Sequence, residues 1–250
     1  MKHRIFAFIF ATSIFATGIF AIGLLTFSMS TAQAEFTAAQ KDDLNKLFET
    51  YIKENPLVVR DALIALAQQE EKDRRAEAMA MLAIDEGDPF MGAGDEADVI
   101  IYEFSDYNCG YCKRVFQQIQ IVLADDPKVR LTLKEYPILA ESSLDAARAG
   151  IAAGMQGKFE AFHTGMMTWR GPISLESVMS VAQDSGLDMA RLEADMASAE
   201  VDAILQRTRA TAQALDVSGT PALVIGDEFI PGAIDASQIK EIIAQQREKS

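Results

Sequence analysis

The only two cysteines of the 250-residue chain, Cys109 and Cys112, stand where a predicted strand gives way to a predicted helix. The apolar run 99–104 is typical of a buried strand, and residues 113–123 have the periodicity of a helix. A cysteine at a helix start faces unpaired amide donors and the positive end of the helix dipole, and both favour the thiolate. A thiolate attacks disulfides, and a second thiol three residues on can displace the captured partner. The spacing therefore predicts thiol–disulfide chemistry.

Two structural interpretations of this cysteine pair fit the sequence poorly. A structural zinc site needs about four ligands, and His163 is the only histidine outside the first 34 residues. A purely structural disulfide across so short a loop stabilises little, because the chain-entropy gain grows with loop length. We therefore predict that Cys109, the more exposed at the helix start, is the nucleophile and that Cys112 is the resolving thiol. No cofactor and no resident metal are expected.

Residues 1–34 have the pattern of a signal peptide. Lys2 and Arg4 form a basic start, residues 5–27 are apolar apart from small or hydroxyl side chains, and residues 32–34 read Ala-Gln-Ala, a cleavage pattern. The alternative is an uncleaved anchor, because the apolar run is long enough to span a bilayer. Both interpretations predict export, by general secretion since there is no twin-arginine pair. A periplasmic location follows as an expectation, and such compartments permit disulfides.

The chain is acidic, with a formal net charge of −14. The predicted leader contributes only basic residues, so the remaining chain is more acidic still. Such a charge disfavours nucleic acids and anionic lipid surfaces, and no nucleic-acid partner is expected. The acidity serves either solubility or the selection of basic partners, and solubility is the simpler explanation.

Residues 35–90 are predicted to form a separate helical segment with a linker. Thr37 and Gln40 make a capping box, and Asn55-Pro56 ends one helix and begins another. Apolar residues recur at helical spacing in both helices: Leu44, Leu47, Phe48, Tyr51, Ile52, Val59, Leu63 and Leu66. Two such helices cannot bury these faces alone. Their partner is the catalytic domain or a second copy, and we favour a homo-oligomer.

Residues 91–250 are predicted to form one α/β domain. The glycine-rich, acidic stretch 85–97 reads as a linker, followed by a strand, the CxxC helix and a second strand at 129–136. A helical insertion covers about 141–215. A hairpin turning at Gly226-Asp227 and a closing helix at 235–246 complete the order. A βαβ unit, a helical insertion and a hairpin with a helix fit a single α/β fold.

Cys-Gly-Tyr-Cys at 109–112 and Gly-Thr-Pro at 219–221, just before the hairpin, resemble the thioredoxin superfamily. The helical insertion makes the chain similar to the DsbA branch of exported thiol–disulfide oxidoreductases. The segment 47–66, with its Glu-Asn-Pro, resembles that of suppressor-of-copper-sensitivity proteins (ScsC). The resemblance implies a thioredoxin fold with an inserted helical domain, preceded by a helical oligomerisation segment. It covers nearly all of the chain after residue 34.

The same resemblance implies roles for further residues around the cysteines. Thr220-Pro221 is expected to be a cis peptide against the cysteines, where it would bind an extended substrate together with Gly110 and Tyr111. Glu103 occupies the position where DsbA-like proteins carry an acid beneath the active site. Lys134 is its expected counterpart on the next strand. The two serve either to move the proton of the buried thiol or as a structural ion pair.

The direction of the reaction is suggested by the residues between the cysteines. Gly110-Tyr111 lacks the histidine of DsbA-like oxidases, and the Cys-Gly-Tyr-Cys pattern is similar to that of the isomerase DsbC. The resemblance thus implies an isomerase or reductase acting on misfolded exported proteins, reset by a DsbD-like membrane reductant. One alternative is a dithiol oxidase served by a DsbB-like oxidant. Another is a non-enzymatic copper(I)-binding protein, because two thiolates can hold a soft cation.

Overall fold

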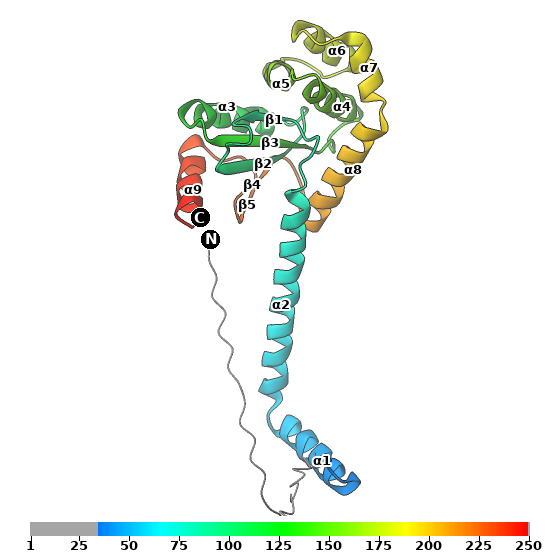
Figure 1. Ribbon diagram of the computed structural model, residues 1–250, viewed down its shortest axis with the longest axis vertical. Coiled ribbons are helices and arrows are strands. Elements are labelled where there is room, and N and C mark those ends of the chain that lie inside the picture. The colour runs from blue at the N-terminus through cyan, green and yellow to red at the C-terminus, as the bar shows by residue number, and fades with distance from the viewer. Residues whose placement is uncertain (1–34, 250) are drawn as a thin grey trace, which may run out of the picture. The chain divides into compact units, whose positions relative to one another are not determined.

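The computed structural model describes residues 35–249, so the predicted signal peptide, 1–34, lies outside the described residues (Figure 1). The chain divides into two compact units between Val59 and Arg60, inside its second helix. Within the described range, no helix is long and apolar enough to cross a bilayer.

The first unit contains α1 (Ala38–Glu54) and the start of α2 (Pro56–Leu82). Thr37 caps α1 as predicted: the backbone N–H of Gln40 donates to its hydroxyl at 3.3 Å, and the Gln40 side chain accepts from its N–H at 2.9 Å. Pro56 is the first residue of α2, also as predicted. No residue of α1 is buried. The exposed apolar side chains of the unit are Phe36, Leu47, Phe48, Tyr51, Ile52, Leu57, Val58 and Val59.

The second unit is built on a five-stranded sheet. Its strands are β1 (Phe90–Gly92), β2 (Val99–Ser105), β3 (Val129–Glu135), β4 (Ala222–Ile225) and β5 (Glu228–Pro231). They lie in the order β1-β3-β2-β4-β5, with β2 and β3 parallel and the other pairs antiparallel. The stretch expected to be a linker, 85–97, therefore contributes an edge strand, because the backbone of β1 pairs with the free edge of β3.

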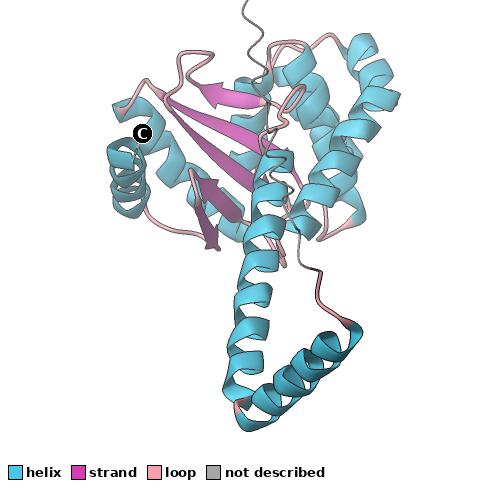
Figure 2. Ribbon diagram, turned by 60° about the horizontal axis from the view of Figure 1, so that its bottom comes forward, coloured by secondary structure: helices cyan, strands magenta, loops and turns pink. Residues whose placement is uncertain are grey.

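Alternation along the strands sends successive side chains to opposite faces of the sheet. On one face, Ile101 and Leu133 pack with α3 (Gly110–Asp125) and α9 (Ala236–Lys249). On the other face, Phe104 packs with Leu82 from the end of α2 and with Ala212 of α8 (Ala199–Ala214). Figure 2 shows the strands between these helices. The sheet is thus covered on both sides, as expected for an α/β domain.

Five helices between β3 and β4 form the predicted insertion. They are α4 (Glu141–Met155), α5 (Phe159–Thr168), α6 (Leu175–Asp184), α7 (Met189–Met196) and α8. Figure 1 shows them gathered at one end of the sheet, with α9 at the other. Serine or aspartate caps the starts of α6, α7 and α8 through side-chain oxygens that accept backbone N–H groups. The α/β class with a helical insertion is confirmed.

Candidate active site

Cys109 and Cys112 lie at the start of α3, directly beyond the end of β2. Cys109 is the N-cap residue, and its sulfur accepts the backbone N–H of Cys112 at 3.4 Å. Cys112 sits one turn inside the helix, completely buried, whereas Cys109 retains 5% of its surface. Both thiols are free in this structure. Cys109 is therefore the more exposed of the two residues, and Cys112 lies behind it in the helix.

The pKa values of the two thiols are shifted in opposite directions. The pKa of Cys109 is lowered to about 5, first because the Cys112 thiol donates to its sulfur and further because backbone N–H groups of the first helical turn do so. The pKa of Cys112 is raised well above its ordinary value, because its thiol donates to Cys109, because it is buried, and because the charge of Glu103 is near. At neutral pH the structure therefore holds a Cys109 thiolate beside a Cys112 thiol.

Alkylation of the reduced protein by iodoacetamide should follow the thiolate of Cys109. Because the pKa of Cys109 is about 5, the rate should rise with pH through about pH 5 and be flat above pH 7. An ordinary thiol would instead titrate near about 8.5. In Cys112→Ala the midpoint should move upward, because the largest cause of the lowered pKa is lost. A wild-type midpoint at pH 8 or above would contradict the assignment.

Thr220-Pro221 lies against the cysteines although more than a hundred residues separate them in sequence. The peptide bond is cis, as the resemblance implied. The Cys109 sulfur lies 3.2 Å from the carbonyl oxygen of Thr220, to which it donates when it is protonated. The Pro221 carbonyl accepts the backbone N–H of Gly232 at 2.9 Å, which ties this turn to the hairpin β4–β5. The hairpin therefore positions Thr220 beside the nucleophile.

The loop between β2 and Cys109 is fixed by Asp106, a residue that the sequence did not single out. Its buried carboxylate accepts the N–H groups of Asn108, Ile138 and Leu139 at 2.8–3.0 Å and the hydroxyl of Ser143 at 2.7 Å. Its carbonyl accepts the N–H of Cys109 at 2.9 Å. Asp106 thus joins the approach to the CxxC turn to the start of α4. An aspartate directly after a strand signals a turn, but its partners are distant in sequence.

A cavity of about 550 Å³ opens beside the cysteines. Its wall on one side is Tyr111, Arg114 and Gln118 of α3, and on the other it is Thr220-Pro221 with residues 232–235 and 238. Tyr111 is 60% exposed, and no atom lies within 4 Å of the place where a side chain on Gly110 would begin. Gly110 and Tyr111 are therefore exposed beside this cavity, and their contact with substrate stays a prediction.

Glu103 is completely buried on the sheet face that α3 covers. Burial raises its pKa to about 8, against the opposing effect of the Ser105 hydroxyl. Its charge is one of the causes that raise the pKa of Cys112. The two groups are therefore electrostatically linked, and a pKa close to neutrality suits proton exchange with a thiol.

The predicted partnership of Glu103 with Lys134 is wrong. In the parallel register Glu103 lies opposite Leu133, and Lys134 lies opposite Phe104, so the two side chains leave opposite faces of the sheet. Lys134 is buried and its ammonium group pairs with Asp88 at 2.5 Å. Asp88 also accepts from Arg207 at 3.0 Å. Lys134 therefore belongs to a buried ion-pair group on the far side of the sheet.

A second set of buried polar groups lies near the active site, and the sequence analysis missed it as a set. The hydroxyl of Tyr107 is 3.0 Å from Nδ1 of His163, and both side chains are fully buried. Burial lowers the pKa of His163 to about 3, so its imidazole is neutral. Burial also raises the pKa of Glu135, the buried carboxyl at the end of β3. His163 is thus a neutral residue of the core, held by its contact with Tyr107.

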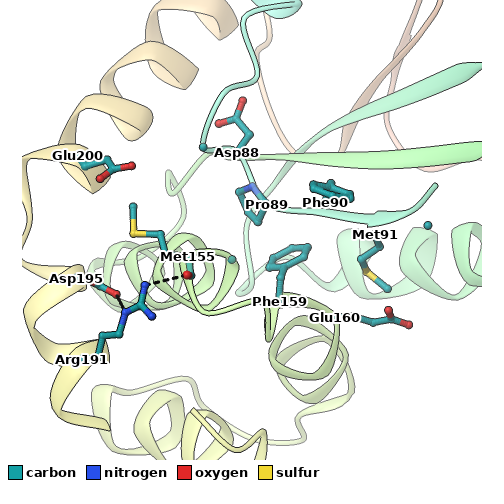
Figure 3. A pocket seen from close by; sticks show the side chains of 14 residues that line it. Asp88, Pro89, Phe90, Met91, Met155, Phe159, Glu160, Arg191, Asp195 and Glu200 are labelled. Atoms are coloured by element: carbon teal, nitrogen blue, oxygen red, sulfur yellow. Dashed lines mark hydrogen bonds and ion pairs between the residues drawn. The ribbon is translucent and has the colours of Figure 1, made fainter. Parts of the chain in front are cut away.

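A larger cavity, of about 720 Å³, lies away from the cysteines between β1 and the helical insertion (Figure 3). Its one arginine, Arg191, is paired with Asp195 and donates to the Met155 carbonyl. Among residues 35–249, no three His, Cys, Asp or Glu side chains gather in a way that could hold a metal ion.

Comparisons with known proteins agree with this geometry. Residues 100–244 match the family model of the DSBA-like thioredoxin domain. The chain also matches curated Na(+)/H(+) antiporters, including NhaA of Herminiimonas arsenicoxydans, at 26% identity over 156 residues. That match covers 61% of this chain and 25% of the antiporter, so the chain spans about a quarter of the length of that relative.

Solved structures of thioredoxin-like proteins superpose on the chain. A thioredoxin-like oxidoreductase from Silicibacter pomeroyi is 40% identical, with a TM-score of 0.65 over 68% of this chain and 98% of that one. A linker-deletion mutant of ScsC from Proteus mirabilis is 26% identical, with a TM-score of 0.65 over 88% and 100% of the two chains. A periplasmic thioredoxin-like protein from Salmonella enterica is 28% identical, with a TM-score of 0.58 over 68% and 95%.

Proposed function

The chain belongs to the family of DsbA-like thioredoxin domains, and we propose that it catalyses thiol–disulfide exchange in exported proteins as an isomerase or a reductase. The observation that carries this proposal is the opposite acidity of the two thiols. An accessible thiolate at Cys109 can attack a substrate disulfide. A buried, protonated Cys112 stays inactive until the first bond has formed.

The proposed cycle begins when the Cys109 thiolate attacks one sulfur of a substrate disulfide. A bond forms between Cys109 and that sulfur, the substrate S–S bond breaks, and the other substrate sulfur leaves as a thiolate. In isomerisation, a substrate thiolate then attacks another disulfide of the substrate, and a substrate sulfur finally displaces Cys109 as a thiolate. In reduction, Cys112 gives up its proton and attacks Cys109, which releases the substrate sulfur as a thiolate and leaves the Cys109–Cys112 disulfide. The acceptor that we propose for this proton is the ionised fraction of Glu103.

The direction of the net reaction depends on how strongly the reduced form is stabilised. A pKa of about 5 for Cys109 lies between the values of about 7 in thioredoxin and about 3.5 in DsbA. Less stabilisation of the thiolate than in DsbA makes the disulfide less oxidising. This supports isomerase or reductase activity over net oxidation. A DsbD-like membrane reductant would then keep the cysteines reduced.

We propose that the first unit makes the chain a homo-oligomer. The apolar side chains of α1 and of the start of α2 are exposed, and an exposed apolar set of this kind marks an interaction surface. Similarity to ScsC over 88% of the chain extends beyond the thioredoxin domain. An assembly that presents several Cys109 thiolates would suit an isomerase acting on misfolded, or copper-oxidised, exported proteins. The predicted signal peptide and the periplasmic relative support a periplasmic location.

Removal of residues 35–69 tests the oligomer and the isomerase together. This deletion retains Arg74, Ala78 and Leu82, through which α2 contacts the thioredoxin unit. The shortened chain should be a folded monomer that still reduces insulin but refolds scrambled ribonuclease about tenfold more slowly or worse, because multivalent engagement is lost. Light scattering gives the mass. An unchanged number of subunits, or an unchanged refolding rate, would contradict the proposal.

Two full-length variants provide a matched pair for the same test. Phe48→Glu places a charge on the exposed apolar side of α1 and should dissociate the assembly. Lys46→Glu changes charge two positions away, on the opposite side of the helix, and disturbs only an exposed ion pair with Asp42. The second variant should keep the mass of the wild type.

A further inference from the structure

We infer that the mouth of the active site binds disulfide-bearing segments rich in acidic residues, against the negative charge of the chain as a whole. We attribute this preference to three cations, Lys113, Arg114 and Arg170, here called the basic rim. The inference rests on the proposed thiol–disulfide activity and adds to it the class of substrate.

Two members of the basic rim, Lys113 and Arg114, make short contacts next to the cysteines. Lys113 and Arg114 directly follow Cys112 in the first turn of α3. The Arg114 guanidinium lies 5.0 Å from the ring centre of the exposed Tyr111, which positions it at the cavity beside Pro221. The Lys113 ammonium donates to the Trp169 carbonyl at 3.1 Å, and Arg170 is the next residue. Lys113 and Arg114 thus belong to α3, and Arg170 belongs to the segment after α5 that Lys113 contacts.

The charges of the basic rim have no acidic partner in the part of the chain that the structure describes. Among residues 35–249, no ion pair includes Lys113, Arg114 or Arg170, whereas cations such as Arg130, Arg148 and Arg247 are paired. Burial lowers the pKa of Lys113, and the nearby positive charge of Arg170 lowers it further, so two like charges lie close together here. Unpaired cations beside a cavity attract anions, and this attraction raises association rates.

One acidic side chain shares the cavity with Arg114 but is engaged elsewhere. Asp235 lies on the opposite wall, where its carboxylate accepts the Ser237 hydroxyl at 2.6 Å and the N–H of Gln238 at 2.9 Å at the start of α9. Asp235 keeps its negative charge at that wall, so the positive charge of the cavity lies on its α3 side, at Arg114. An extended segment passing Pro221 would place its side chains against this wall, and aspartate or glutamate there would meet Arg114.

The test compares three synthetic peptides that share one disulfide loop and differ only in flanking residues, which are glutamate, glutamine or lysine. The second-order rate of mixed-disulfide formation with the reduced full-length protein is measured by stopped flow. At about 20 mM salt the glutamate peptide should react about tenfold faster than the lysine peptide, and at 500 mM salt the ratio should fall toward one. The net charge of the chain predicts the opposite order.

The matched variants neutralise three cations in each case. Lys113→Gln with Arg114→Gln and Arg170→Gln should bring the glutamate-to-lysine ratio close to one. The control, Lys128→Gln with Lys158→Gln and Arg209→Gln, removes exposed cations that also form no described ion pair, and it should leave the ratio unchanged. Each ratio divides two rates measured with the same variant. A change in the reactivity of the Cys109 thiolate affects both rates equally and therefore cancels from the ratio.

The outcomes separate this inference from the proposed activity. If the glutamine peptide does not react, thiol–disulfide exchange itself is refuted. If that peptide reacts but the wild-type ratio is one, or favours lysine, the basic rim does not select acidic segments. Equal loss of the ratio in the two triple variants would also overturn the inference, because general charge would then be responsible.

Discussion

Replacement of Cys109 by serine should lower the rate of insulin reduction and of scrambled-ribonuclease refolding by at least about 10³-fold, to the uncatalysed background. Cys109 is the one thiol with both access to solvent and a pKa of about 5. A serine hydroxyl at the same place stays protonated and does not form a mixed disulfide. Both activities are measured on the full-length chain, with glutathione as the external reductant.

The informative control is the other cysteine. Cys112→Ser keeps the attacking thiolate but removes the resolving thiol, so mixed disulfides with substrate should accumulate and be visible by mass spectrometry without reductant. Cys109→Ser should give none. Refolding activity retained in Cys109→Ser would refute the assignment of the nucleophile, and mixed disulfides carried by Cys112 would reverse the two roles.

Replacement of Asp88 by alanine should lower the free energy of unfolding by about 3–5 kcal/mol. The side chains of Asp88 and Lys134 are almost fully buried, and Arg207 approaches the other carboxylate oxygen at 3.0 Å. Without Asp88, the Lys134 ammonium keeps only the Ile84 carbonyl at 3.2 Å and the Tyr102 ring at 5.3 Å. An uncompensated charge would remain in the interior.

Urea unfolding with matched controls measures this cost. Asp125→Ala removes an exposed partner of Lys240 and should cost less than about 1 kcal/mol. The double variant Asp88→Leu with Lys134→Met removes both charges together and should recover much of the stability that Asp88→Ala loses. A loss below about 1 kcal/mol in Asp88→Ala would show that the ion pair is not confined to a low-dielectric interior.

The main elements of the fold could be predicted because their signals are local. The apolar run 99–104 is β2, and the predicted helix after the cysteines is α3, which extends to Asp125. Thr37 and Pro56 mark helix starts through hydrogen bonds and geometry within a few residues. β1 was missed because Phe90–Gly92 is too short to carry an alternating pattern, and only pairing with β3 makes it a strand.

Charged residues of the core could not be paired from the sequence. Glu103 and Lys134 both lie on central strands, and the register of those strands decides which face each side chain occupies. The register is set by pairing between segments some thirty residues apart. A shift of one strand by one position would move each of its side chains to the opposite face of the sheet. Asp88, the actual partner of Lys134, lies in a stretch that reads as a linker.

By itself the sequence determined the chemistry: two thiols three residues apart at a helix start, where the local backbone favours the thiolate at the first of them. Only the tertiary structure decided the surroundings of those thiols. Asp106 fixes the turn, Thr220 meets Cys109, Arg114 lines the cavity opposite Pro221, and Lys113 contacts the Trp169 carbonyl. Helix caps and periodicity act within a few residues and can be recognised from the sequence. Contacts across the sheet depend on packing, which spacing along one chain does not specify.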